Sequence, residues 1–376
     1  MALPKKLLAL FMVTLLSFAV VACGPADEDE NGEEEATEPE DETLQVGIVL
    51  STGGLGDQSF NDAAYRGLEW AEEDFDIEFT HIEPEDVAED AQSLRQFAER
   101  GYDLIFGVGF QMADSLETVA QEYPDIKFGH VDEDFGEDIP DNVESLNFAE
   151  HEGSFLAGAL AAKVSESGTI GYVGGEDFGL IHRFEGGFVQ GAQYIDEDIE
   201  IISDYAASFE DSGRGREIAL SFIDRGADVI YHAAGGSGMG VIEAAEESGI
   251  YAIGVDSNQN WVAPGHVITS MLKQVDNAVY ETVERVIDGT YEGGLNREFG
   301  LEDDGVSLSS LTEIDVEEEE AVELESIDEE DLEVIKEMKK EITAPHKERI
   351  EELEQKIIDE EIEVEDWMFL DERPDY

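Results

Sequence analysis

The sequence is poor in cysteine and in basic residues. It has one cysteine, and only 21 of its 376 residues are lysine or arginine, against 94 aspartates and glutamates, so the formal net charge is −73. So large an acidic excess argues against nucleic-acid binding, because that function needs a basic surface. With one cysteine, no disulfide can form within the chain, and the folded state must be held by its packed cores.

The acidic residues are spread along the whole chain, while the 41% share of apolar residues is ordinary. Mutual repulsion at this charge destabilises a compact domain in dilute buffer, and salt screens it, with a Debye length of about 3 Å at 1 M. The composition is therefore typical of a halophilic protein, in which an acidic surface covers an ordinary core.

The one cysteine, Cys23, ends an apolar run at the N-terminus. Lys5 and Lys6 precede residues 7–21, which are too few for a membrane-spanning helix but have the n-region and h-region of a secretory signal. The run closes with Val-Val-Ala-Cys, which resembles a lipobox, where the thiol is acylated and the chain is cut before it. We therefore expect residues 1–22 to be a signal peptide, and lipid on Cys23 to hold the protein at the extracytoplasmic face of the cell membrane. An ordinary secretory signal with a chance cysteine is the alternative.

Residues 23–44 are almost free of basic and apolar side chains, which predicts a disordered, lipid-anchored acidic linker. Calcium binding is the competing interpretation, because the spacing of a calcium loop is matched by Asp27, Asp29, Asn31, Gly32 and Glu38. No apolar-periodic helix flanks this match, so we favour a solvated linker.

From Leu44 onward, short apolar runs of the buried-strand type alternate with helical stretches. The first unit has expected strands at 46–50, 77–82, 104–108, 127–131 and 143–147 and helices at 61–73, 88–100 and 113–122. The second has strands at 169–173, 199–202, 229–232 and 251–255 and helices at 152–164, 186–195, 215–225 and 241–248. This alternation predicts an α/β fold with parallel sheets covered on both faces, and its repetition predicts two similar lobes.

From Asp315 onward the sequence predicts mostly acidic helix. Apolar residues recur there at near-helical spacing, namely Leu332, Ile335, Met338, Ile342, Ile350, Leu353, Ile357 and Ile358. We expect this stripe to pack on a lobe rather than to bind a partner.

Polar loops follow several of the expected strands, and open parallel sheets bind ligands at the carboxyl ends of their strands. The loops are residues 51–62, 109–114, 206–211, 232–240 and 255–259, and Asp132 ends the fourth strand of the first unit. Each could be an ordinary loop, and the first could be a turn with a helix cap. Together they predict a cleft between two lobes. The first loop is not a dinucleotide fingerprint, because Ser59 stands where the third glycine belongs.

Motifs for catalysis are missing from the sequence. It has no G-x-S-x-G, no H-E-x-x-H and no second cysteine, and acids are too abundant for a carboxylate pair to be informative. The histidines show no metal-ligand spacing, and His81, His130 and His232 fall in expected strands. We therefore expect no enzyme activity, no metal and no cofactor.

Six blocks carry a resemblance to a known family: residues 53–61, 107–110, 147–158, 233–238, 253–259 and 269–273. In this order they resemble the basic membrane protein family of lipoproteins, which includes the purine nucleoside receptor A type. These are substrate-binding components of ABC transporters that capture nucleosides. The resemblance implies a type I periplasmic-binding-protein fold, with two Rossmann-like lobes and a hinge of three crossings.

We expect residues 45–147 plus 257–290 in the first lobe. Residues 148–256 plus 291–376, with an acidic helical extension, are expected in the second.

The resemblance also implies roles for particular residues. A purine would stack between Phe60 and Phe209, while Asp256, Lys273 and the backbone at Gly235 or Gly236 would hold the ribose. An aspartate would read the base edge, for which Asp132 is the first choice and Asp114 the second. Independently of the resemblance, Asp57, Ser59 and Asn61 in the first loop supply further polar atoms. For Lys273, a salt bridge that steadies a hinge strand is the alternative.

The chain departs from the family pattern in two places. Ser51 stands where many relatives carry an aspartate, and residues 315–330 resemble an acidic insertion. We expect a monomeric receptor that closes around a nucleoside and hands it to a membrane permease driven by a separate ATPase. The alternatives are the same fold binding a sugar or another small polar ligand, a sensory or adhesive surface lipoprotein, and a nucleoside hydrolase.

Overall fold

The computed structural model describes residues 43–370, 373, 374 and 376. The expected signal peptide, Cys23, the calcium-loop match and almost all of the acidic linker lie outside the described residues. Among the residues described, none of the helices has the length and apolar character needed to cross a bilayer.

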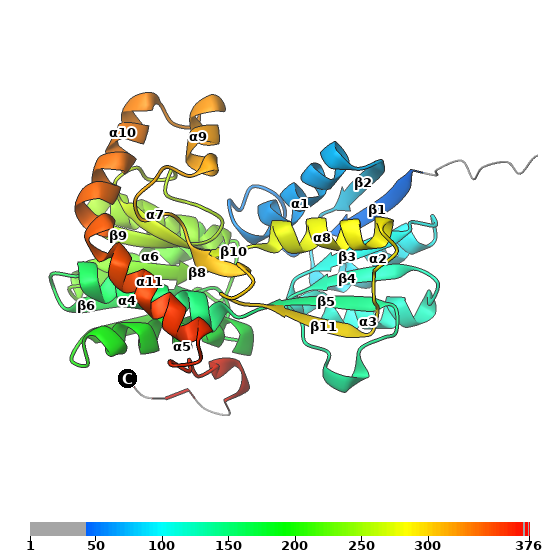
Figure 1. Ribbon diagram of the computed structural model, residues 1–376, viewed down its shortest axis with the longest axis horizontal. Helices are drawn as coiled ribbons and strands as arrows, with labels where there is room; N and C mark the ends of the chain where they lie inside the picture. Colours follow the sequence, from blue (N-terminus) through cyan, green and yellow to red (C-terminus); the bar gives the residue numbers. More distant parts are fainter. Residues whose placement is uncertain (1–42, 371–372, 375) are drawn as a thin grey trace, which may run out of the picture. The chain divides into compact units, whose positions relative to one another are not determined.

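The first lobe is built on a parallel six-stranded sheet in the order β11-β5-β4-β3-β1-β2. Its strands are β1 (Leu44–Val49), β2 (Ile77–Ile82), β3 (Leu104–Val108), β4 (Lys127–Val131), β5 (Val143–Phe148) and β11 (Leu295–Phe299). Its helices are α1 (Phe60–Asp74), α2 (Asp90–Ala98), α3 (Ala113–Glu122) and α8 (Val275–Ile287). Helices α1 and α8 share one apolar core, and α2 and α3 share another on the opposite face (Figure 1). Every residue of β3 is buried, as expected for a strand that is covered on both faces.

The second lobe repeats this plan with the order β12-β10-β9-β8-β6-β7. Its strands are β6 (Thr169–Gly174), β7 (Glu200–Tyr205), β8 (Val229–Ala233), β9 (Tyr251–Asp256), β10 (Val267–Lys273) and the antiparallel β12 (Val306–Leu308). Its helices are α4 (Glu150–Val164), α5 (Gly179–Ile195), α6 (Ser212–Asp224) and α7 (Gly236–Ser248). Helices α4 and α5 approach closely because both carry glycine at the contact. A Cβ on Gly158 would lie 2.0 Å from the carbonyl oxygen of Phe188, and one on Gly191 would lie 1.9 Å from that of Phe155.

The expected division of the chain between the lobes is wrong in two places. Residues 257–273 belong to the second lobe, because β10 pairs with β9. Residues 291–299 belong to the first, because β11 pairs with β5. The chain passes between the sheets after β5, after β10 and after β11. An apolar run shows that a strand forms but not which strand pairs with it, so the crossing points could not be placed from the sequence.

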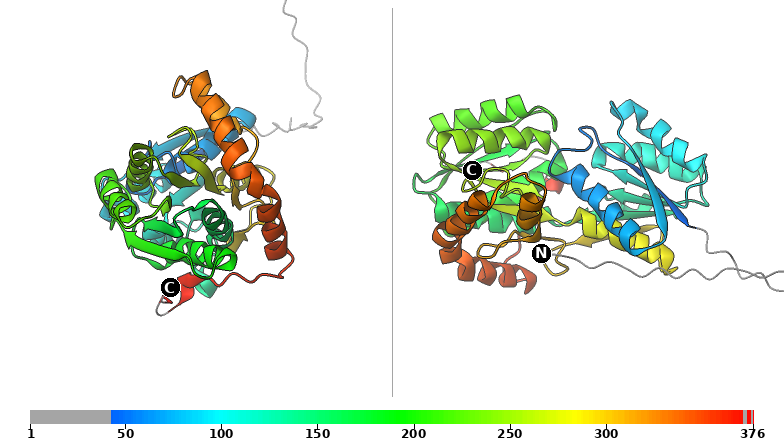
Figure 2. Two further views of the ribbon diagram at one scale, coloured as in Figure 1. Left: turned by 90° about the vertical axis from the view of Figure 1, so that its left-hand side faces the viewer. Right: turned by 90° about the horizontal axis from the view of Figure 1, so that it is seen from above.

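The C-terminal helices α9 (Val316–Glu323), α10 (Glu329–Met338) and α11 (Lys347–Ile358) belong to the second lobe (Figure 2). The expected stripe packs inward, with Ile335, Met338, Ile350, Leu353 and Ile357 buried. The acidic stretch at 315–330 is anchored as well, because the buried Glu318 lies 2.7 Å from the Nζ atom of the buried Lys339. Short helical turns occur at Val87–Glu89, Phe110–Met112, Gly136–Asp138, Lys339–Thr343, Ala344–His346 and Trp367–Phe369.

Candidate ligand-binding site

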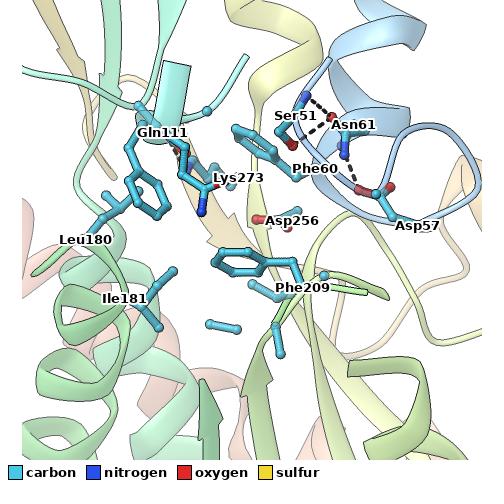
Figure 3. A pocket seen from close by; sticks show the side chains of 18 of the residues that line it. Ser51, Asp57, Phe60, Asn61, Gln111, Leu180, Ile181, Phe209, Asp256 and Lys273 are labelled. Atoms are coloured by element: carbon cyan, nitrogen blue, oxygen red, sulfur yellow. Dashed lines mark hydrogen bonds and ion pairs between the residues drawn. The ribbon is translucent and has the colours of Figure 1, made fainter. Parts of the chain in front are cut away.

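A cavity lies between the carboxyl ends of the two sheets (Figure 3). In each lobe the first strand, β1 or β6, lies between the second and third strands of its unit, which makes the strand order reverse there. Ligands in open α/β sheets bind at such switch points. The cavity and its opening together hold about 700 Å³ of empty space, part of which is open solvent.

Most of the predicted site residues line this cavity. They are Asp57, Phe60, Asn61, Asp132, Phe209, Gly235, Asp256 and Lys273. Asp114 does not, because it lies exposed in the first turn of α3. Gly236 is the first residue of α7 and is also absent from the lining, so the backbone at this point is presented by Gly235.

Two phenylalanine rings face the cavity from different lobes. Phe60 is the first residue of α1, and Phe209 lies in the loop between β7 and α6. Figure 3 shows the two rings on opposite sides of the space, with Asp256 beside them. The Phe209 ring has room because residue 175 is glycine. A Cβ added to Gly175 would lie 2.2 Å from that ring. A flat ligand could stack between them, each stack contributing about 0.5–1.5 kcal/mol beyond area burial.

Lys273 is the last residue of β10 and is only 2% exposed. Its Nζ atom lies 2.6 Å from an oxygen of Asp132 and 2.9 Å from an oxygen of Glu150. It also lies over three aromatic rings, at 5.0, 5.1 and 5.6 Å from the centroids of Phe60, Phe148 and Phe184. Burial alone lowers the pKa of Lys273, but the neighbouring carboxylates outweigh it and raise this pKa above its usual value. Lys273 therefore carries its charge into the cavity.

Two aspartates at strand ends complete the polar wall. Asp132 and Asp256 have left-handed backbones, with φ of 74° and 62°, a conformation that aspartate tolerates better than most residues. Burial raises the pKa of Asp132 to about 6 and that of Asp256 to about 7, while Lys273 acts in the opposite direction on both. Asp256 also accepts a hydrogen bond from the Ser59 hydroxyl of the other lobe.

Asp57 and Asn61 shape the loop after β1. The Asp57 carboxylate accepts hydrogen bonds from the backbone N–H groups of Ser59 and Asn61, both at 2.9 Å, and of Asp62 at 3.2 Å. Burial raises its pKa to about 6. The Asn61 side-chain oxygen accepts from the backbone and hydroxyl of Ser51, each at 3.0 Å. These oxygens therefore hold the loop in place, while both residues also line the cavity.

The two lobes also touch beside the cavity. The rings of Phe110 and Phe178 stack with centroids 4.5 Å apart and planes 10° from parallel. Next to them, the Gln111 amide donates to Glu176 at 3.0 Å. Phe110 and Gln111 line the cavity from the first lobe, whereas Glu176 and Phe178 precede α5 in the second. These contacts hold the lobes in a closed arrangement.

Replacing Phe178 with alanine is expected to weaken ligand binding by about 0.5–1.5 kcal/mol, because the stack that favours the closed form is lost. Phe178 is not part of the cavity lining and is 44% exposed, so the fold is expected to be unaffected. Calorimetric titration measures the change. Tyr194→Ala, which removes an exposed aromatic ring within α5, is the control. Equal affinities of Phe178→Ala and the unmodified protein would contradict this role.

The three histidines of the expected strands lie in the core or near the surface, away from the cavity lining. His130 and His232 are fully buried in β4 and β8, and burial lowers their pKa values to about 3 and about 4, so both are neutral. His81 lies near the surface, 3.4 Å from Glu83. Within the described part of the chain, no group of histidine, cysteine, aspartate and glutamate is arranged to hold a metal ion.

Sequence reasoning missed three apolar residues and one polar residue at the site. Leu180, Ile181 and Phe184, in the first turns of α5, line the cavity. Glu150 supports the site through Lys273. Ser59, which the sequence had already indicated as a polar residue of the first loop, supports it through Asp256. The loop after β6 is another strand end, so the rule applied to the other strands would have pointed to the start of α5.

Residues 44–348 match the sequence model of a family described as ABC transporter substrate-binding protein PnrA-like. A relative named basic membrane protein B, from Borrelia garinii subsp. bavariensis, is 36% identical over 314 residues, which cover 81% of this chain and 89% of the relative. A Listeria innocua protein named CD4+ T-cell-stimulating antigen is 33% identical over 325 residues, covering 80% of this chain and 89% of that one.

Solved structures share the fold. An ABC transporter solute-binding protein from Aeropyrum pernix K1 is 32% identical, with a TM-score of 0.80 over 85% of this chain and 92% of that one. A solute-binding protein from Conexibacter woesei, at 20% identity, has a TM-score of 0.67 over 86% of this chain and 99% of that one. The predicted two-lobed periplasmic-binding-protein fold is thereby confirmed.

Proposed function

The chain belongs to the PnrA-like family of ABC transporter substrate-binding proteins, and from this premise we propose that it captures nucleosides, with purine nucleosides as the first candidates. The cavity between the lobes is the proposed binding site. The observation that carries the proposal is the pairing of Phe60 and Phe209 across the cavity with Lys273 and Asp256 in its wall.

This pairing suits the two halves of a nucleoside. A base is flat and has a π face, so it can stack between Phe60 and Phe209. A ribose diol has hydroxyl groups that both donate and accept, which matches the Asp256 carboxylate and the Lys273 ammonium. Hydrogen bonds to charged groups contribute about 1.5–3 kcal/mol each. Gly235, with a φ of 51°, brings backbone to the same wall.

Asp132 is proposed to read the edge of the base. Its carboxylate is held by Lys273, whose Nζ atom is 2.6 and 2.7 Å from its two oxygens. A carboxylate fixed in this way can accept a hydrogen bond from a ring N–H, a group that guanosine and inosine have and adenosine lacks. Asp132 is therefore expected to favour the first two nucleosides.

The rest of the proposed function concerns partners and place. The protein would be held by lipid on Cys23 at the extracytoplasmic face of the membrane. There it would act as a monomer and deliver its ligand to a permease and an ATPase. The structure describes neither Cys23 nor any partner, so this part depends on the sequence pattern and on the family.

Thermal unfolding in molar salt, with and without inosine, guanosine, adenosine, cytidine or ribose, tests the ligand class. A ligand at about 100 times its dissociation constant stabilises by about 2.7 kcal/mol, which raises the unfolding midpoint. We expect the purine nucleosides to raise the unfolding midpoint and ribose to leave it unchanged. A higher midpoint with ribose alone would favour the sugar-binding alternative, and no response from the folded protein would refute nucleoside binding. Release of free base during incubation would instead indicate a hydrolase.

Replacing Phe60 with alanine tests the stacking wall. Loss of one base-aromatic stack is expected to weaken nucleoside binding by about 1–3 kcal/mol. Phe79→Ala is the control, because Phe79 packs on Tyr65 at 5.2 Å outside the cavity. Calorimetric titration with guanosine compares the two variants. If Phe60→Ala bound as tightly as Phe79→Ala, the ring would have no part in the site.

A further inference from the structure

Residues 359–370, 373, 374 and 376, here named the C-terminal strap, follow α11, and the turn Trp367–Phe369 packs against α5 (Figure 1). They lie beyond the part of the chain that matches the family, which ends at residue 348. Trp367 of the strap is 3% exposed, and it packs where α5 has Gly186, since a Cβ there would lie 2.4 Å from the indole. Gln190 of α5 pairs with the backbone of Glu365 in both directions, at 2.8 and 2.9 Å.

Charges on the strap and on α5 are complementary. Asp366 accepts hydrogen bonds from the Nε and Nη2 atoms of Arg183, at 2.9 and 2.6 Å. In the opposite sense, Arg373 of the strap lies 2.7 Å from the fully buried Glu185. The other Asp366 oxygen accepts from the backbone N–H of Met368 at 2.9 Å, which fixes the carboxylate in the strap.

The same stretch of α5 contributes Leu180, Ile181 and Phe184 to the cavity wall. Arg183 lies between these residues in sequence and is itself buried. Its Nη1 atom is 3.2 Å from one oxygen of Glu150, and the other oxygen of Glu150 is 2.9 Å from Lys273. An unbroken line of ion pairs thus joins Asp366 of the strap to Lys273 in the cavity.

We propose that the strap positions the ligand site from outside it, with Asp366 as a positioning residue that acts through Arg183 and Glu150. The Arg183 guanidinium forms ion pairs with three carboxylates. Its nitrogens lie 2.6, 3.2 and 3.0 Å from oxygens of Asp366, Glu150 and the exposed Glu298. Without Asp366, the buried Glu150 becomes the main partner of Arg183 and is drawn away from Lys273. The Lys273 ammonium then loses one of the two carboxylates that orient it. The choice of a nucleoside as the ligand that detects this effect rests on the proposed function.

The isosteric replacement Asp366→Asn tests the strap, with guanosine and inosine as probes. Substitutions along a coupled network change binding by about 2-fold to 30-fold, and we expect a loss of affinity in that range. Asp366→Glu keeps the charge and is expected to restore most of the affinity. Glu363→Gln, at an exposed position of the strap, is the matched control and is expected to bind as the unmodified protein does.

A double-mutant cycle with Glu150→Gln separates positioning from general loosening of the fold. If Asp366 acts through Glu150, the loss caused by Asp366→Asn shrinks markedly once Glu150 is neutral. Additive losses, or an affinity unchanged by Asp366→Asn, would overturn the proposal.

Amide hydrogen exchange of the ligand-free protein supplies a readout that needs no nucleoside. Faster exchange at Gly179–Phe184 in Asp366→Asn, but not in Glu363→Gln, is the expected result. If the unmodified protein bound none of the nucleosides, the proposed function would fail, and exchange alone would decide on the strap. Unchanged exchange at α5 would then overturn it.

Discussion

Replacing Lys273 with methionine is expected to abolish nucleoside binding and to lower the free energy of unfolding by about 3–5 kcal/mol. Lys273 is the buried cation of the cavity, and Asp132 and Glu150 lie 2.6 and 2.9 Å from its Nζ atom. Methionine has a similar length but no charge, so these buried carboxylates lose a partner. Removing one partner of a buried pair costs more than the pair contributes, because the remaining charge stays out of water.

Urea unfolding and titration with guanosine measure the two effects of Lys273→Met. Lys339→Met is the matched control, because Lys339 is also fully buried, lies 2.7 Å from the buried Glu318 and does not line the cavity. Both variants are expected to lose stability, but only Lys273→Met is expected to lose binding. Retained guanosine binding in a folded Lys273→Met protein would leave Lys273 with the purely structural role of steadying the hinge.

Replacing Asp256 with asparagine is expected to separate binding from stability. Under the proposed function, Asp256 is a charged acceptor for the ribose, and its loss would weaken binding by about 1.5–3 kcal/mol. The ligand-free protein is nevertheless expected to become more stable at pH 8. Burial raises the pKa of Asp256 from 3.8 to about 7, so the native state holds this proton at pH values where the unfolded state has released it. The contribution of Asp256 to stability therefore falls as the pH rises from about 4 to about 7, and each pKa unit corresponds to about 1.4 kcal/mol.

Asparagine cannot ionise, so the advantage of Asp256→Asn over the unmodified protein is expected to be small at pH 4 and a few kcal/mol at pH 8. Urea unfolding at both pH values measures it. Asp57→Asn is an informative comparison. Burial also raises the pKa of Asp57, to about 6, but its carboxylate accepts three backbone hydrogen bonds that one amide oxygen cannot replace. That variant is expected to lose stability. An Asp256→Asn protein less stable than the unmodified one at pH 8 would show that the ionised carboxylate stabilises the fold.

The starts of two helices show where local patterns mislead. Helix α5 was expected from residue 186 and begins at Gly179, and α7 was expected from residue 241 and begins at Gly236. Glycine has a low helix propensity, and three of the five residues at 236–240 are glycines, so the local sequence of α7 favours a loop there. Both helices begin at strand ends beside the cavity, where small residues let the backbone approach a ligand. The start of α5 at residues 179–185 contains only one glycine, so glycine content does not explain why its site residues were missed.

The sequence by itself determined those features that depend on local periodicity and on position along the chain. Apolar runs such as residues 46–50 predict buried strands, and the polar loop after each strand is expected at a carboxyl edge, so the two lobes and the cleft could be predicted. The roles of Phe60, Asp256 and Lys273 came from the family resemblance. The tertiary structure decided which side chains are engaged with one another. It placed β10 in the second sheet. It also showed that the side chains of Asp57 and Asn61 form hydrogen bonds within their own loop region. Finally, it linked Lys273 to Asp366 through ion pairs with Glu150 and Arg183. These contacts join residues far apart in the chain, and in a sequence so rich in acids no local pattern distinguishes the few carboxylates that find a buried cation.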